Sequence, residues 1–479
     1  MIRRGVALLL ALSSLAAGCV AGPAPEIETA VSLPQSFAFT PAERTASSME
    51  ALLPVSDPAF RTLTGIAQSN APSLAEALAR VEGARANVRG AGAARGPQVS
   101  LDRTISANRI NPNQFSDTIA GFVDTEQVSF GTNVIASWDP DLFGVLKSAQ
   151  RAAISRAEAA EANARAVELA LIAEIAVSVI DWNTLTAREA ALREDLAAAQ
   201  RLAQLAGTRE RAGLAPGFDR LRAEAAASSS QTRLDLLGSE RAVIIGRLIT
   251  LTGASGQSVQ AAFALEAPER AVPDPVAALP SQLLENRPDV LAAAAQLAAS
   301  DAQLAAAARQ RFPRLTLSAA LGLLSFDLGG LVDEDAVVGS ASAALLGPIF
   351  DFGRIQSEID AAAADKRAAF AAYRGAVFTA LGDAETAYAL VAASDRELSA
   401  AWNETSQLER TAQLADTRYR AGLSDFLTVL EARRTADASG ERAAASEGRV
   451  MRARVLLWQA LGGSTLDYRP ADGTVQPSP

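Results

Sequence analysis

The side chains that most often carry enzyme chemistry are scarce in this sequence. Its 479 residues include no histidine and a single cysteine. A Ser-His-Asp triad, a His-ligated metal site and a zinc site built from several cysteines are therefore excluded. Two lysines, Lys147 and Lys366, leave little room for Schiff-base chemistry. Catalysis would have to rest on carboxylates alone, and no paired-carboxylate motif is found, so we predict no enzyme activity, cofactor or metal site.

The charge balance argues against a nucleic-acid partner. Lys and Arg total 44 against 54 Asp and Glu, which gives a net charge of −10, and the basic residues form no stripe along the chain. Proteins that bind nucleic acid neutralise phosphates with clustered positive charge, so no nucleic acid is expected as a partner.

The single cysteine, Cys19, follows a segment with the properties of a secretory signal peptide. Residues 1–18 contain two arginines near the start, an apolar run too short to span a bilayer, and small residues at the end. This arrangement resembles a bacterial lipobox, in which the cysteine becomes an acylated N-terminus, although Ala16 stands where a lipobox usually has leucine. Val20 follows Cys19, in place of the Asp that signals retention in the inner membrane. We expect a lipid anchor at Cys19 in the outer membrane of a Gram-negative bacterium; a buried cysteine in an ordinary signal peptide is the alternative.

A short motif occurs twice and marks an internal duplication. Its copies lie between long helix-forming stretches and predict the turn of a helical hairpin; they are Arg211-Ala212-Gly213-Leu214 and Arg420-Ala421-Gly422-Leu423. The offset between the two glycines is 422 − 213 = 209, and the Phe-Gly pair ending at Gly144 recurs at Gly353 with the same offset, 353 − 144 = 209. Pro97 matches Pro313 at an offset of 313 − 97 = 216, so the first copy is longer after Pro97 by 216 − 209 = 7. The chain is predicted to be a tandem duplication of a unit of about 200 residues.

Four segments predict β-strands, two in each half. They are residues 97–108, 126–137, 313–323 and 337–349. Each has the length of a tilted membrane-spanning strand and alternates apolar with polar or small residues, although Arg103 interrupts the apolar face of the first. Periodicity alone favours a half-buried soluble hairpin; the lipobox reverses that preference. Four strands cannot close a barrel, so we expect a homo-oligomer that pools strands, and three chains would supply twelve.

Two very long helices are expected after the strand pairs. Residues 146–208 and 355–417 contain no proline, and each would be about 100 Å long. The second has apolar residues at alternating three- and four-residue steps, which predicts a coiled-coil seam, at Phe370, Tyr373, Val377, Leu381, Ala384, Tyr388 and Val391. Shorter helices are predicted at residues 73–95, 218–251, 288–311 and 425–461. Two short helices stacked end to end have about the length of one long helix. This match in length predicts a cylinder of paired helices.

This combination resembles the TolC-like outer-membrane efflux protein family, in particular the lipoprotein branch that serves resistance-nodulation-division (RND) pumps. The resemblance is carried by Asn286-Arg287-Pro288-Asp289-Val290, Phe312-Pro313, residues 348–354, residues 418–423 and residues 460–463. It implies a homotrimer in which a twelve-stranded outer-membrane β-barrel continues into an α-helical barrel in the periplasm. Such a channel would be the exit duct of a tripartite pump, conducting drugs or other small molecules with a periplasmic adaptor (membrane fusion) protein and an inner-membrane RND-type transporter.

The same resemblance assigns roles to residues at the turns. In the family the hairpin tips meet the adaptor, which implies adaptor contacts at Arg211, Ala212, Gly213, Leu214, Arg420, Ala421, Gly422 and Leu423. Leu427 and Glu431 match positions where the family places an apolar constriction and an acidic ring around the periplasmic entrance. Three like carboxylates around a narrow axis repel one another and prefer cations. A solvated helix face is the alternative interpretation of Glu431, whose counterpart in the first half is Arg222.

The expected organisation has five parts. These are a signal peptide at 1–18, a lipidated and proline-rich extended arm at 19–72, a first structural repeat at 73–272, a second at 273–463 and a flexible tail at 464–479. Two other functions stay open: an exit duct for type I protein secretion, and a structural coiled-coil lipoprotein without a pore. Three methionines are too few to favour a methionine-lined path for soft metals.

Overall fold

The computed structural model describes most of the chain in two compact units. The described residues are 25–39, 48–109, 111, 126–264, 272–276, 278 and 280–463. The first unit comprises Met1–Ala30, Val81–Ala160 and Ala293–Tyr373, and the second comprises Val31–Arg80, Glu161–Ala292 and Arg374–Pro479. The predicted signal peptide, Cys19 and the predicted tail at 464–479 lie outside the described residues.

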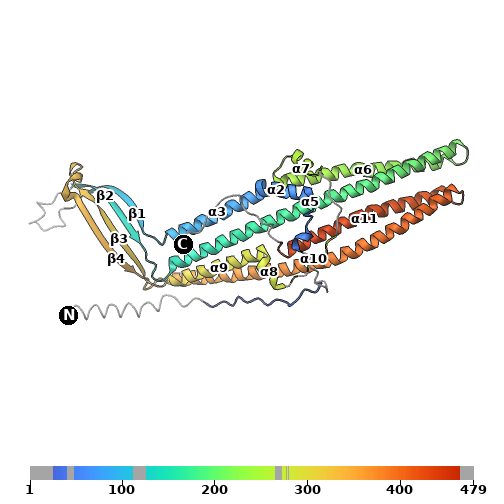
Figure 1. The fold of residues 1–479 in the computed structure, drawn as a ribbon. Coiled ribbons are helices and arrows are strands. Elements are labelled where there is room, and N and C mark those ends of the chain that lie inside the picture. Colours follow the sequence, from blue (N-terminus) through green and yellow to red (C-terminus); the bar gives the residue numbers. More distant parts are fainter. Residues whose placement is uncertain are drawn as a thin grey trace, which may run out of the picture. The chain divides into compact units, whose positions relative to one another are not determined.

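The first unit contains an antiparallel sheet built from both halves of the chain. Its strands follow one another in the order β1-β2-β3-β4 (Figure 1); they are β1 (Gln98–Arg109), β2 (Glu126–Trp138), β3 (Arg314–Ser325) and β4 (Val337–Leu346). All four predicted strands are confirmed. The last ends at Leu346 instead of residue 349, and Pro348 just beyond it could not donate a ladder hydrogen bond.

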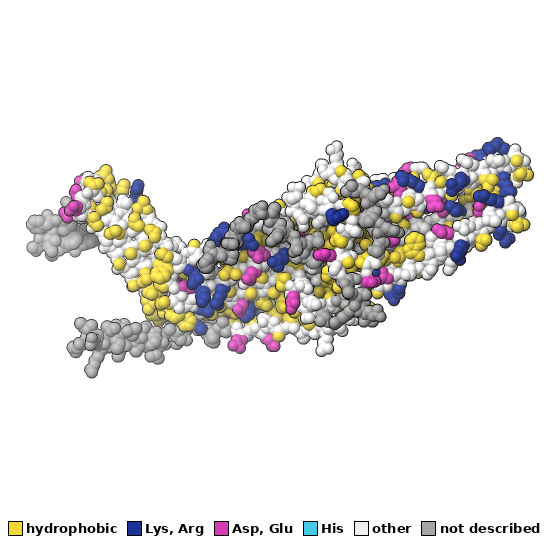
Figure 2. Space-filling view, in the orientation of Figure 1, with side chains coloured by type: hydrophobic (Ala, Val, Ile, Leu, Met, Phe, Trp, Pro, Cys, Tyr) yellow, Lys and Arg dark blue, Asp and Glu magenta, His cyan; other side chains and the backbone are white. Residues whose placement is uncertain are grey.

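The register gives the sheet one apolar and one mostly polar face. On one face Leu101 lies opposite Val134, which lies opposite Leu321. On the other face Ser100 and Asp102 are paired with Ile135 and Asn133. Leu321 is 64% exposed, and hydrophobic side chains are spread over the sheet surface (Figure 2). Within one chain the apolar face is therefore uncovered, which suits contact with lipid.

The two outer strands each have a free edge. Among the described residues β1 pairs with β2 alone, and β4 pairs with β3 alone. Unpaired backbone N–H and C=O groups cannot remain in hydrocarbon, because the loss of their hydrogen-bond partners is too costly in free energy. The sheet is complete only when strands from other copies pair with its edges.

The helices of the two halves match closely. The long helices α5 (Val145–Arg211) and α10 (Arg354–Arg420) have 67 residues each. Their return helices are α6 (Gly217–Thr252) and α11 (Phe426–Ala460). The helices that precede the strands are α3 (Pro72–Ala93) and α9 (Pro288–Arg309). The predicted seam of α10 is confirmed over its second half, since Val377, Ala384, Tyr388 and Val391 are buried.

Each long helix begins at a sharp turn set by the repeated Phe-Gly motif. Gly144 and Gly353 have positive φ angles of 79° and 83°, which disfavour residues with a side chain. The Asp141 carboxylate accepts hydrogen bonds from Leu146 N (2.9 Å) and Lys147 N (2.7 Å), and that of Asp351 accepts one from Ile355 N (2.8 Å). These carboxylates satisfy the free N–H groups of the first helical turn.

Helix α9 is long and apolar enough to cross a membrane by length and composition. Its apolar side, however, packs on the start of α10. Leu304, Ala307 and Ala308 form a buried cluster with Ile355, Ile359 and Ala363. The high alanine content of α9 thus serves close helix packing within the first unit.

The N-terminal part of the second unit corrects one expectation. The arm is expected to be extended from residue 19 to residue 72, but α2 (Pro58–Asn70) is a 13-residue α-helix within it. Asp57 is its N-cap and accepts a hydrogen bond from Ala59 N (2.9 Å). Pro58 takes the first helical position, where the missing N–H has no cost. Short helices at α7 (Gly256–Ala262) and α8 (Pro280–Asn286) are also absent from the sequence prediction.

Tyr388 and Glu385 of α10 hold two irregular segments of the chain. The Glu385 carboxylate accepts hydrogen bonds from Ala38 N (2.7 Å) and Phe39 N (3.3 Å) of the arm. The Tyr388 hydroxyl donates to Val276 O (2.9 Å) and accepts from Ala278 N (3.0 Å) in the segment between the repeats. One turn of α10 therefore anchors both the arm and the connection between the two halves.

The Asn-Arg-Pro-Asp motif that carries part of the family resemblance is structural. The Arg287 guanidinium donates to Asp289 (2.7 Å), Asp383 (2.9 Å) and the Ala460 carbonyl (2.9 Å). Burial acts to raise the pKa of Asp289, but the hydrogen bond and charge of Arg287 outweigh it and hold that pKa below its usual range. The motif thus ties the start of α9 to α10 and to the end of α11.

Gly448 of α11 lies close to Thr184 of α5, and this gives a test of the packing. A Cβ added to Gly448 would lie 3.0 Å from Thr184 Cγ2 and 3.2 Å from Thr184 Cβ, whereas one added to Gly440 of the same helix would meet nothing within 4 Å. Gly448→Ala should destabilise the protein by about 1–3 kcal/mol through overpacking. Gly440→Ala should stabilise it by about 0.5–1 kcal/mol through helix propensity. Thermal unfolding of the purified variants measures both; equal effects would contradict the close approach.

Candidate functional site

The two hairpin tips have the same backbone geometry. Leu214 N donates to Arg209 O (2.8 Å) and Gly213 N to Glu210 O (2.9 Å). In the second tip Leu423 N donates to Arg418 O (2.8 Å) and Gly422 N to Tyr419 O (3.0 Å). This pattern is the Schellman ending of a helix, which needs a left-handed residue. Gly213 and Gly422 supply it with φ angles of 72° and 74°.

The predicted tip residues are brought to the surface. All eight are exposed: Arg211, Ala212, Gly213, Leu214, Arg420, Ala421, Gly422 and Leu423. Leu214 is 75% exposed and Leu423 69% exposed. Lys and Arg side chains gather at this end of the hairpins (Figure 2). The tips therefore present exposed leucines surrounded by arginines, a composition that suits a protein contact.

A buried cluster braces the two tips against each other. It is made by all four hairpin helices and contains Leu202, Ala206, Ala223, Ala415, Tyr419, Phe426, Val429 and Leu430. The rings of Tyr419 and Phe426 meet edge to face at 5.9 Å, and the Arg209 guanidinium lies 4.5 Å from the Tyr419 ring centre. The cluster positions the two exposed turns within the second unit.

The return helices begin differently in the two tips. The Asp425 carboxylate accepts a hydrogen bond from Thr428 N (2.7 Å) and caps α11. Hydrogen bonds from Thr428 hold the pKa of Asp425 below its usual range. In the first tip Pro216 takes this place and offers no side-chain cap. The start of α6 is instead tied to the tip by Arg220, which pairs with Glu210 (2.7 Å).

Leu427 and Glu431 lie one turn apart on an exposed side of α11. Leu427 is 40% exposed and Glu431 is exposed. Within the described part of the chain no ion pair to the Glu431 carboxylate is found. Their counterparts in the first hairpin, Phe218 and Arg222, make a cation–π contact at 4.0 Å. The carboxylate is thus a feature of the second hairpin alone.

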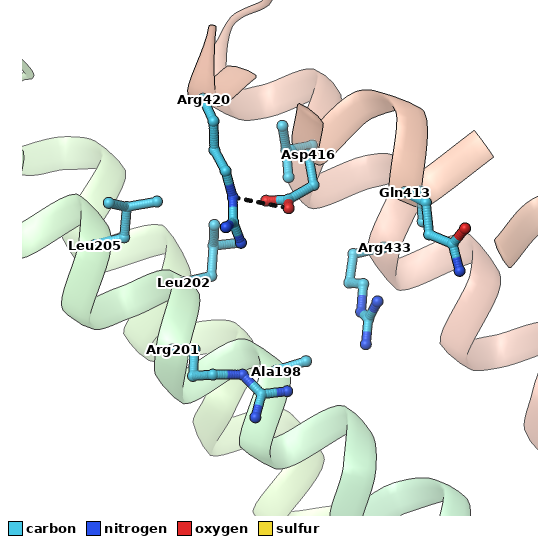
Figure 3. Close-up of a pocket in the computed structure, with 10 residues that line it drawn as sticks. Ala198, Arg201, Leu202, Leu205, Gln413, Asp416, Arg420 and Arg433 are labelled. Carbon is cyan, nitrogen blue, oxygen red and sulfur yellow. Dashed lines mark ion pairs between the residues drawn. The ribbon is translucent and has the colours of Figure 1, made fainter. Parts of the chain in front are cut away.

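A cavity of about 390 Å³ lies between α5 and the second hairpin, just behind the tips (Figure 3). Leu202, Leu205 and Val429 give it apolar walls, and Arg201, Arg420 and Arg433 line it with positive charge. Arg420 is paired with Asp416 at 2.9 Å. Sequence reasoning missed this cavity, because its lining comes from segments far apart in the chain that share no motif.

A polar network joins α5, α6 and α11 farther from the tips. Arg188 of α5 pairs with Glu240 of α6 (3.0 Å) and with Glu441 of α11 (2.8 Å). Arg233 of α6 pairs with Asp195 of α5 (2.6 Å) and with Glu441 (3.3 Å). The first hairpin is thereby tied to the return helix of the second. Sequence reasoning also missed this network, since single charges on a helix most often mark a solvated face.

No group of His, Cys, Asp and Glu side chains that could hold a metal ion is found among the described residues.

The sheet with an apolar face, the two 67-residue helices and the paired tips define a TolC-like channel subunit. The chain belongs to the outer membrane efflux protein family, whose profile matches residues 63–254 and again residues 279–463. The starts of the two matches differ by 279 − 63 = 216 and their ends by 463 − 254 = 209, the same two offsets that separate the repeated motifs. The family profile thus matches each half of the duplicated fold separately.

Individual relatives cover nearly the whole chain. The pyoverdine export outer membrane protein OpmQ of Pseudomonas aeruginosa is 31% identical over 95% of this chain and 96% of its own. The outer membrane protein OprJ of the same organism is 29% identical over 96% of this chain and 95% of its own. The solved structure of the outer-membrane channel OprN superposes with a TM-score of 0.81 at 26% identity, over 93% of this chain and 99% of that one. The protein is an outer-membrane efflux channel of a family that forms trimers and works with pump partners.

The cap at Asp425 should control order at the start of α11. Asp425→Ala removes the acceptor for Thr428 N, so the amides of Phe426 to Val429 should exchange faster with solvent. Asp219→Ala, in the first turn of α6, is the matched control and should leave exchange there unchanged. Because the pKa of Asp425 is lowered, the cap is complete at neutral pH and is lost only as the pH falls through that lowered value. Hydrogen–deuterium exchange near neutral pH measures the difference; equal exchange in Asp425→Ala and wild type would rule out the cap.

Proposed function

We propose that the chain, as a homotrimer, is the exit duct of a tripartite RND-type pump for small organic molecules. The observation that carries this proposal is the four-stranded sheet with free edges and one apolar face, joined to two helices of equal length. Three copies would supply twelve strands and leave no edge in lipid. The name of the relative OpmQ, a pyoverdine export protein, supports a small-molecule cargo. Selection of the cargo would belong to the transporter, since a passive duct has no energy source of its own.

We further propose that Cys19 anchors the protein to the outer membrane through acyl chains. The lipobox-like segment at residues 16–19 supports this, as does the absence of Asp at position 20. A lipid anchor at the start of the arm would add membrane affinity to that of the barrel.

The hairpin tips are proposed to dock the periplasmic adaptor. The exposed Leu214 and Leu423 would be buried in the contact, and the arginines beside them would set its register. The adaptor would in turn join the duct to the inner-membrane transporter. Two matching tips in each chain give a trimer six similar docking points.

Leu427 and Glu431 are proposed to form the periplasmic gate. Their exposure on one side of α11, next to the second tip, supports the assignment. In a three-fold arrangement the leucines would narrow the entrance, and the three carboxylates would favour cations.

Gly422→Pro tests the tip assignment. Proline cannot adopt the φ of 74° at this position and has no N–H to donate to Tyr419 O. In a strain that lacks its own duct, expression of the wild-type protein should restore pump-dependent drug resistance. This variant should fail to restore it, while its trimer still forms in the outer membrane. Gly440→Ala, on the same hairpin but away from the tip, should keep full resistance. Unchanged resistance in Gly422→Pro would overturn the docking role.

Glu431→Gln tests the gate and the duct together. The purified trimer should conduct ions in planar bilayers, and the variant should lose a large part of the cation preference, because three carboxylates become neutral. Glu409→Gln on α10, another exposed carboxylate, should leave ion selectivity unchanged. A preference that survives in Glu431→Gln would place the selective ring elsewhere, and a purified protein that is monomeric and never conducts would refute the duct.

A further inference from the structure

Positive charge gathers where the sheet meets the helices of the first unit (Figure 2). The four helix–strand connections lie there, within residues 89–97, 138–151, 309–314 and 348–354, and these segments carry eight Lys and Arg against three Asp. The local excess of 8 − 3 = 5 positive charges contrasts with the net charge of −10 of the whole chain. At the opposite end of the sheet, residues 326–336 between β3 and β4 include four acidic residues and no Lys or Arg. The two ends of the sheet therefore differ in charge.

Arginines from the other connections are held against the turn between β2 and α5. Three of them contact side chains of that turn: Arg95 contacts Gln150, Arg309 contacts Ser148, and Arg314 contacts Asp139. The Arg95 guanidinium donates to Gln150 Oε1 at 2.8 Å, and the Arg95 carbonyl accepts a hydrogen bond from Trp138 Nε1 at 2.9 Å. Segments far apart in the sequence thus place their cations around a single turn.

Lys147 and Arg151 of α5 add two cations to this turn. They lie four residues apart, so they share one face of the helix. Both are exposed, and within the described part of the chain neither side chain has an ion pair or a hydrogen bond. The acids of the turn are engaged, since Asp139 pairs with Arg314 and Asp141 accepts hydrogen bonds from the first amides of α5. Lys147 and Arg151 are therefore available to an anion from outside the chain.

Aromatic side chains lie at the same level of the first unit. Trp138 is 40% exposed and Phe143 is 41% exposed, and the Phe143 ring stacks on that of Phe312 with ring centres 4.9 Å apart. In membrane barrels, aromatic residues form girdles at the two interfaces between hydrocarbon and water. The apolar strands also end at this level. The turn thus lies where the headgroups of one lipid leaflet meet the protein.

The internal duplication indicates that helix capping does not require these charges. Helix α10 also begins after a glycine of positive φ, and an aspartate caps it as well. At the offset of 209 residues, however, Lys147 corresponds to Gln356 and Arg151 to Asp360. The same kind of helix start therefore occurs in the second half without the two cations, so their presence in the first half needs another explanation.

Five cations make up the basic rim: Arg95, Lys147, Arg151, Arg309 and Arg314. We propose that the basic rim binds the phosphate groups of anionic phospholipids in the leaflet next to the helices. Such a lipid fits because its acyl chains would lie on the apolar face of the adjoining sheet while its phosphate reaches the cations. Free phosphate would make only the second contact. The identification of this leaflet as the periplasmic one rests on the proposed function, whereas lipid binding does not.

Native mass spectrometry of the purified trimer tests the basic rim. Wild type should retain phosphatidylglycerol in preference to phosphatidylcholine with the same acyl chains, because phosphatidylcholine has no net charge. The double variant Lys147→Gln/Arg151→Gln should lower this preference by roughly tenfold. Lys147→Arg/Arg151→Lys, which keeps both charges, should preserve it. Glutamine already occupies the position that corresponds to Lys147 in the second half, so the helix start should tolerate it, and the same spectra report whether the trimer is intact.

The double variant Arg201→Gln/Arg410→Gln is the matched control. These exposed arginines of α5 and α10 correspond to each other in the two halves and lie outside the basic rim, so the lipid preference should not change. Equal retention of both lipids by wild type, or an unchanged preference in Lys147→Gln/Arg151→Gln, overturns the proposal.

A thermal-shift experiment separates lipid from free phosphate. Phosphatidylglycerol should raise the unfolding temperature of wild type more than that of Lys147→Gln/Arg151→Gln, and inorganic phosphate alone should raise neither. The same effect from inorganic phosphate would make the basic rim a site for a free anion and overturn the lipid assignment. Neither measurement needs conductance or a pump partner, so a trimer that binds the lipid but never conducts would refute the proposed duct alone.

Discussion

The free edges of β1 and β4 impose the constraint on which the rest of the structure depends. Backbone groups in hydrocarbon must be paired, and the described part of one chain offers two open edges and an uncovered apolar face. The sheet is therefore stable in a membrane only within a ring of copies, as in the trimers of this family. Every other element must then be compatible with rotational symmetry. The helices that follow the strands inherit that symmetry, because each begins a few residues after a strand ends, at the turns held by Gly144 and Gly353.

The internal duplication is compatible with this symmetry, because one structural unit is repeated in the chain. Strand pair, long helix, tip and return helix occur in the same order in both halves, and the long helices have equal lengths of 67 residues. Equal lengths allow the two tips to reach the same buried cluster around Tyr419 and Phe426. The extra length of the first copy falls between Pro97 and Gly144, in the segment that holds the β1–β2 connection. An insertion in a strand connection changes neither the strand register nor the helix length, so it is tolerated there.

Periodicity and turn chemistry predict most of this fold. Strands and long helices have patterns that extend over many residues, so the predicted bounds lie close to the observed ones. The first long helix is predicted to end at Thr208, but it continues to Arg211, because a Schellman ending places the glycine two residues beyond the last helical residue. Helix α2 escapes prediction because clustered prolines usually indicate extended chain, although Asp57-Pro58 is also a helix start. The ion pair between Arg188 and Glu441, which lie in opposite halves of the chain, has no sequence pattern at all.

The two halves have diverged where function would require it. The tips keep the same backbone geometry, since both end a long helix, and each has an exposed leucine. One turn farther the second hairpin has a capped helix with Glu431, and the first has the Phe218–Arg222 contact in the corresponding place. The proposed carboxylate ring needs one copy of the charge per chain, and Arg222 in the matching position gives the two hairpins opposite charges there. The ion pairs of Arg188 and Arg233 with Glu441 tie the return helix of the second hairpin to the first hairpin, so the two diverged tips stay in a fixed relation to each other.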